Sequence, residues 1–329
     1  MPTWGKILAE IKEALRQSVP APFDVVRRKY LASLHSLTGR NTILYYGANE
    51  LEGAINDEDV QALMEVFHGL SGPSLDIILQ SPGGSAEATE AMVLYIRSKF
   101  DDVRVFVPLT AMSAATMLAC SANLIVMGRH SFLGPIDPQI ITRDSAGVRS
   151  VPAQAVLDQF ELAKEQCKDP KLLGAWLPML PQYGPALLVQ CRNAIELSES
   201  LVSSWLRTYM FAGEADAAEH AAKVAKTLAN HRLFKTHGRH LGREQVKSIG
   251  LKILDLEADL KLEDAVLSVF HAASHTITST PAVKIVENHE GKAFIRVKQV
   301  VLAPVAQRPV PSEPQSSPNS LEDGGGGDS

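Results

Sequence analysis

The chain has 329 residues, of which 45% are hydrophobic, and it carries a formal net charge of −5 at pH 7. A chain of this length can bury a sizeable core as one large domain or two smaller ones. The negative charge and the lack of a basic stripe argue against a nucleic-acid partner. The three cysteines suggest a reduced compartment and lack the spacing of a metal site, so we expect neither metal nor cofactor.

Residues 1–40 begin with MPTWGKILAEIKEALRQ, in which charged and apolar residues alternate at helical spacing. The pattern predicts an N-terminal pair of amphipathic helices that pack against the core, with binding to a membrane surface as the alternative. The segment lacks the apolar centre of a signal peptide, and no run of 18 uncharged apolar residues occurs in the sequence. We therefore expect a soluble, cytoplasmic protein without a membrane span.

Residues 41–145 alternate short apolar strands with helical stretches. The strand patterns are NTILYY, LDIILQ, VRVFVPL and LIVMG, and the helical patterns between them are DEDVQALMEVFHG, SAEATEAMVLYIRSKF and SAATMLACSA. This alternation is typical of right-handed βαβ units on a parallel sheet. The sequence therefore predicts a core of the α/β class.

The rest of the chain divides into three segments. Residues 146–230 contain long helical patterns, which predict a helical region inserted in the core. Residues 231–303 hold a histidine-bearing loop, a helix, a short strand and a predicted β-hairpin made of VKIVEN and AFIRV. Residues 304–329 are rich in proline and glycine, and we expect them to be disordered.

Two strand-to-helix junctions suggest chemistry. In LQSPGGSAEA, the Pro82-Gly83-Gly84 turn leaves backbone N–H groups bare, and such a turn can hold a developing oxyanion. In LTAMSAATM, Ser113 lies near the start of a helix. Adjacent βα units place both junctions at the carboxyl edge of a parallel sheet. A serine nucleophile would then lie beside bare backbone donors, which is the geometry that acyl transfer needs. Each piece also has a plain explanation, because such a serine is more often a helix N-cap and Pro-Gly-Gly is usually just a turn.

Three motifs in order carry a resemblance to a known family: SPGGSAEATEAMVLYIRS, AMSAATMLACSANLIVMG and SFLGPIDPQ. They resemble the serine dehydrogenase proteinase family, a distant relative of Clp proteases within the Clp/crotonase superfamily. The likeness extends over residues 27–300. It implies an α/β, Clp/crotonase-type core of stacked ββα units with helical insertions and a C-terminal β-hairpin.

The resemblance also implies a serine peptidase with a peptide or protein as substrate. Ser113 matches the family's nucleophile, Asp137 of GPIDPQ matches the acid, and His237 of the Thr-His pair matches the base. In Clp proteases the histidine follows the serine near the position of Asp137, but this chain has no histidine at 135–139. The order Ser-Asp-His would therefore replace the Clp order.

The backbone of both junctions would complete this predicted site. Gly83, Gly84 and Ala114 are the expected oxyanion-hole residues, with the N–H groups of Gly84 and Ala114 as donors. A site with this hydroxyl, imidazole and pair of backbone donors would be that of a serine protease, as the resemblance implies.

The residues alone leave alternatives open. An aspartate such as Asp137 is more often part of a turn or a cap. Among the ten histidines, His240 is the runner-up to His237 as base, and His231 comes third. Lys164 or Lys168 would give a Ser-Lys dyad, although lysines on an amphipathic helix are usually solvated. A crotonase-like acyl-thioester enzyme and an inactive peptide-binding scaffold are the other function classes.

We also expect a homo-oligomer. Relatives in the superfamily generally assemble through elements that flank the active site, which is an argument by analogy. The predicted hairpin would be only marginally stable alone and needs another surface. An apolar stripe of Leu197, Leu201, Trp205 and Tyr209 fits packing either within one chain or across an interface.

Overall fold

The computed structural model describes residues 4–144 and 147–298, so the predicted disordered segment 304–329 lies outside the described residues. Seven strands form a central sheet in the order β10-β5-β3-β2-β1-β11-β12, and the five strands from β10 to β1 run parallel. Their bounds are β1 Asn41–Gly47, β2 Ser74–Gln80, β3 Asp102–Val107, β5 Leu124–Met127, β10 Ile253–Asp255, β11 Ala282–Asn288 and β12 Ala293–Val297. The α/β prediction is confirmed.

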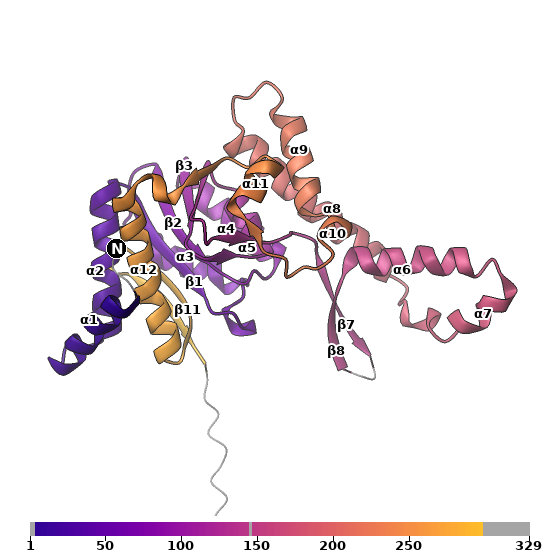
Figure 1. Ribbon diagram of the computed structural model, residues 1–329, viewed down its shortest axis with the longest axis horizontal. Helices are drawn as coiled ribbons and strands as arrows, with labels where there is room; N and C mark the ends of the chain where they lie inside the picture. The colour runs from indigo at the N-terminus through magenta and orange to yellow at the C-terminus, as the bar shows by residue number, and fades with distance from the viewer. Residues whose placement is uncertain (1–3, 145–146, 299–329) are drawn as a thin grey trace, which may run out of the picture. The chain divides into compact units, whose positions relative to one another are not determined.

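Helices cover both faces of this sheet, which is why its strands are apolar on both sides. Alternate residues separate the faces, so Ile43 and Tyr45 join one hydrophobic cluster while Leu44 and Tyr46 join another. The first cluster includes residues of α3 (Glu58–Phe67), α4 (Ala86–Arg97) and α5 (Ala114–Cys120). The second includes residues of α2 (Pro22–Thr38) and α12 (Leu260–Ser279), which lie side by side in Figure 1.

The N-terminal helix α1 (Trp4–Arg16) packs on the same chain. Its buried residues Ile7 and Ile11 contact a small cluster with Val26 of α2 and Ala272 of α12. No helix among residues 4–144 and 147–298 is long and apolar enough to cross a membrane. The expected cytoplasmic location stays a prediction.

The predicted C-terminal hairpin is confirmed, but it does not stand alone. Strand β11 pairs antiparallel with β1, with Tyr45 opposite Val286, and β12 then pairs with β11 at the sheet edge. The hairpin therefore finds its second surface within its own chain. Trp205 of the apolar stripe is likewise buried in the core. Both local arguments for an oligomer contact thus lose their force, and homo-oligomerisation stays a prediction.

A long insertion separates β6 (Phe132–Leu133) from the last part of the core. It begins with an antiparallel pair, β7 (Gln139–Asp144) and β8 (Gly147–Pro152), which straddles the boundary that the sequence pattern placed after residue 145. The helices that follow are α6 Ala153–Gln166, α7 Pro170–Trp176, α8 Leu187–Trp205 and α9 Ala217–Leu228. The chain returns through the short helix α10 (His231–Phe234) and through α11 (Arg243–Ile249).

A second, small sheet positions the predicted site residues. Its strands β4 (Thr110–Ala111), β6 (Phe132–Leu133) and β9 (Leu241–Gly242) pair in the order β4-β6-β9. Ser113 follows β4, Asp137 follows β6 and His237 precedes β9. Three segments that are distant in the sequence therefore meet beside this sheet.

Candidate active site

Ser113 adopts a backbone conformation that side-chain-bearing residues rarely adopt. Its φ is 52° and its ψ is −119°, at the sharp turn between β4 and α5. It occupies the N-cap position of α5, yet its side chain makes no capping hydrogen bond there. Ser85, by contrast, caps α4 by accepting a hydrogen bond from the N–H of Ala88 at 3.0 Å. The N-cap explanation thus holds for Ser85 and not for Ser113, whose strained turn is of the kind found at functional sites.

The glycine turn packs directly against the serine turn. The N–H of Ser81 donates to the carbonyl of Thr110 at 3.1 Å, and the N–H of Met112 donates to the carbonyl of Ser81 at 3.0 Å. A Cβ on Gly83 would lie 2.7 Å from the Cβ of Ser113 and 2.6 Å from the carbonyl oxygen of Met112. With a φ of +99°, Gly83 is also in the region that favours glycine. Only glycine allows this close approach.

The backbone donors in these turns differ in availability. The N–H of Gly83 already donates to the Ser81 hydroxyl at 3.2 Å, so Gly83 serves through packing rather than as a free donor. Among residues 4–144 and 147–298, no hydrogen bond from the N–H of Gly84 or of Ala114 to the protein is found. Both residues line the cavity that contains Ser113. Two donors therefore remain for an oxygen bound there.

Asp137 lies in a segment whose backbone is held from several sides. The Gly134 N–H donates to Thr116 Oγ1 at 2.9 Å, and the Ile136 N–H donates to the carbonyl of Leu228, at the end of α9, at 3.0 Å. The Ile136 carbonyl accepts a hydrogen bond from Ser198 of α8 at 2.8 Å. These contacts hold Asp137 in place with only 2% of its surface exposed.

The Asp137 carboxylate binds two histidines rather than one. Its Oδ1 lies 2.8 Å from Nδ1 of His237, and its Oδ2 lies 2.8 Å from Nδ1 of His231. The amide of Gln139 adds a longer hydrogen bond to Oδ2, at 3.2 Å. A buried carboxylate needs such partners, because an unpaired buried charge is costly. His231, which ranked third among the base candidates, thus shares the acid with His237.

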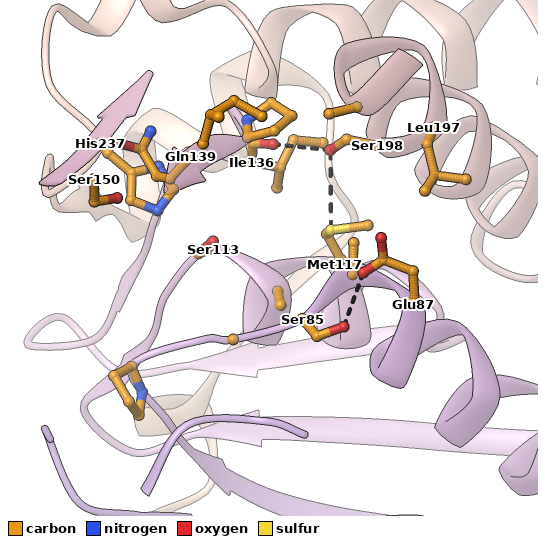
Figure 2. Close-up of a pocket in the computed structure, with 17 residues that line it drawn as sticks. Ser85, Glu87, Ser113, Met117, Ile136, Gln139, Ser150, Leu197, Ser198 and His237 are labelled. Atoms are coloured by element: carbon orange, nitrogen blue, oxygen red, sulfur yellow. Dashed lines mark hydrogen bonds between the residues drawn. The ribbon is translucent and has the colours of Figure 1, made fainter. Parts of the chain in front are cut away.

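A cavity of about 460 Å³ brings Ser113 and His237 together. In Figure 2, His237 lies with Gln139 and Ser150 on one side of Ser113, and Met117 and Leu197 lie on the other. No hydrogen bond joins the Ser113 hydroxyl to His237 among the described residues. The other residues that line the cavity are Pro82, Gly84, Ser85, Ala86, Glu87, Ala114, Ile136, Pro138, Ile140, Ala194 and Ser198.

The other base candidates lie elsewhere. His240 packs its ring edge-on against Phe132, with 5.1 Å between centroids, and does not contact Asp137. Lys164 is exposed on α6 and pairs with Glu161 of that helix, and Lys168, which lies just beyond the end of α6, is exposed and pairs with Glu165. None of the described residues that line the cavity is a lysine.

A known protein family matches the part of the chain that carries Ser113 and Asp137. The family of ClpP-like SDH-type serine proteinases matches residues 55–172, a range that includes Ser113 and Asp137 but not His237. Two uncharacterised proteins of Methanocaldococcus jannaschii are 26% and 25% identical over 179 residues, which is 54% of this chain and 51% and 53% of theirs. The chain thus spans about half the length of the curated relatives it matches.

A solved structure, a mutant of the membrane-bound stomatin-specific protease 1510-N, is also similar. The likeness covers 63% of this chain and 77% of that one, with 16% sequence identity and a TM-score of 0.36. The family match rests on the segment that carries the glycine turn, the serine turn and the GPIDPQ motif. The resemblance seen in these motifs is confirmed, because residues 55–172 match the family of ClpP-like SDH-type serine proteinases.

Proposed function

We propose that this protein is a serine peptidase that hydrolyses a peptide or protein substrate through Ser113, His237 and Asp137. The observation that carries the proposal is a single cavity lined by both Ser113 and His237, with Nδ1 of His237 bonded to the buried Asp137. That bond leaves Nε2 of the imidazole to act as base. A base oriented by a third group is the arrangement that activates a serine hydroxyl.

The proposed reaction follows from these positions. His237 takes the hydroxyl proton as Ser113 Oγ bonds to the peptide carbonyl carbon, and the N–H groups of Gly84 and Ala114 hold the oxyanion. His237 then gives the proton to the leaving amine as the C–N bond breaks, and water hydrolyses the acyl-enzyme. Each oxyanion donor contributes about 3 kcal/mol of transition-state stabilisation. Hydrogen bonds between base and nucleophile often tighten only when substrate binds, which fits the open geometry of Ser113 and His237.

A Ser-Lys dyad is the main rival within the same reaction class. The dyad requires a lysine that reaches Ser113, whereas Lys164 and Lys168 form ion pairs with Glu161 and Glu165 of α6. The contact between Asp137 and His237 supports the histidine mechanism instead. A crotonase-like enzyme or an inactive scaffold would need no nucleophile, so the strained turn at Ser113 favours the peptidase.

Labelling with a fluorophosphonate probe tests the proposal. We expect wild-type protein to be labelled, Ser113→Ala to lose the label and His237→Ala to react far more slowly. Ser150→Ala is the matched control, because Ser150 lines the same cavity outside the proposed machinery. Labelling that survives in His237→Ala and disappears in Lys164→Met or Lys168→Met would establish the dyad. An unlabelled protein that binds coenzyme A thioesters would establish the crotonase-like alternative.

A further inference from the structure

The second histidine on Asp137 has no role in the proposed triad. Oδ1 of the carboxylate contacts His237, and Oδ2 contacts His231 and the amide of Gln139. His231 does not line the cavity, whereas His237 does. Any effect of His231 on Ser113 must therefore pass through Asp137.

The contact with Asp137 determines which ring nitrogen of His231 carries a proton. An ionised carboxylate only accepts hydrogen bonds, so each Nδ1 that lies 2.8 Å from it must carry a proton. Only 14% of the His231 side chain and 2% of the Asp137 side chain are exposed, compared with 27% for His237. Water therefore has little access to Oδ2, and the His231 Nδ1–H donates the short hydrogen bond that this oxygen accepts.

We infer that His231 is a positioning residue for the proposed reaction: by holding Oδ2 of Asp137, it keeps Oδ1 on Nδ1 of His237. This inference rests on the proposed function. Without His231, the carboxylate keeps only the 3.2 Å hydrogen bond from Gln139 on that side and is free to rotate. The imidazole of His237 then loses its fixed partner. A misplacement of about 1 Å in a catalytic group lowers the rate by about 100-fold.

The fold explains why His231 lies there. The hydrogen bond from Ile136 N–H to the carbonyl of Leu228 brings the end of α9 beside the aspartate segment. Asn230 then caps the four-residue helix α10, accepting from the N–H of Leu233 at 3.0 Å, so the first residue of α10 is held next to Asp137. The position of His231 is thus set by backbone contacts independent of its own ring.

Two amide substitutions separate a positioning role from a structural one. In His231→Asn, the amide nitrogen falls close to the position of Nδ1 and can donate to Oδ2, whereas the longer side chain of His231→Gln places its nitrogen farther out. We expect kcat to fall about 10- to 100-fold in His231→Gln and in His231→Phe, with little change in KM, and to recover most of this loss in His231→Asn. His240→Phe, in the loop that follows α10, is the matched control, and we expect wild-type kcat.

A merely structural role would give another pattern. The unfolding free energy of the His231 variants would fall, while the kcat of the folded protein stayed at the wild-type value, and this result would overturn the inference. Equal losses in His231→Asn and His231→Gln would also overturn it, because the position of the donor would then not matter. Since both are amides of similar polarity, the comparison holds even if His231→Phe does not fold.

A readout independent of hydrolysis keeps this inference separate from the proposed function. NMR of ¹⁵N-labelled histidine reports which ring nitrogen carries the proton. We expect His237 to be protonated at Nδ1 in wild-type and in His231→Asn, and to show a mixture of tautomers in His231→Gln. Unchanged His237 signals in His231→Gln would overturn the positioning role. If Ser113→Ala alters neither probe labelling nor hydrolysis, the proposed function fails, while the tautomer result still decides the effect of His231 on His237.

Discussion

Replacing Gly83 with alanine tests whether the contact between the two turns sets the position of Ser113. The added Cβ would lie 2.7 Å from the Cβ of Ser113, about 0.7 Å closer than the 3.4 Å at which ordinary contacts begin. Because Gly83 is held by its own N–H bond to Ser81, we expect the serine turn to yield. A displacement approaching 1 Å should slow fluorophosphonate labelling by about 100-fold.

The backbone strain of the substitution has a matched control. Gly72 has a similar φ of +88°, compared with +99° for Gly83, but a Cβ there would meet no atom within 4 Å. Gly72→Ala therefore carries the strain, on the order of 1–2 kcal/mol of lost stability, without the steric contact. Urea unfolding measures the shared loss, and labelling kinetics measure the loss specific to Gly83. Gly83→Ala that reacts as fast as Gly72→Ala would refute the reasoning.

Four further predictions follow from the structure. Asp137→Asn should slow labelling at least about 100-fold, because the amide nitrogen that replaces one carboxylate oxygen is a donor and cannot accept from the Nδ1–H that faces it; wild-type kinetics would contradict the proposed triad. Lys284→Met should lower the unfolding free energy in urea by about 3–5 kcal/mol, since the carboxylate of Asp59 stays buried without its cation. Burial, and next the charge of His35, lower the pKa of His289 below 6.5, so the stability that this group contributes above that pH should be lost on acidification, and His289→Asn should flatten the pH dependence of unfolding. Light scattering should give a mass above the 35.6 kDa of one chain, and a mass near that value would contradict homo-oligomerisation.

Local patterns in the sequence were sufficient to predict much of this protein. Hydrophobic periodicity and turn residues indicated the βα alternation of residues 41–145 and the hairpin at the end of the described chain. Such signals depend only on neighbours along the chain. The same patterns did not indicate the β7–β8 pair, in which apolar residues such as Ile141 are exposed rather than buried in a core.

Only the tertiary structure decided which groups meet. His231 and His237 lie 94 and 100 positions from Asp137 in the sequence, and both contact its carboxylate, while His240, three residues after His237, does not. The tertiary structure also decided that the hairpin pairs with β1 of its own chain and not with a neighbouring subunit. The physical reason is that residue type and local periodicity specify what a side chain can do and which element carries it. Which partner it reaches depends on the path of the backbone, here on the bond that ties Ile136 to the end of α9.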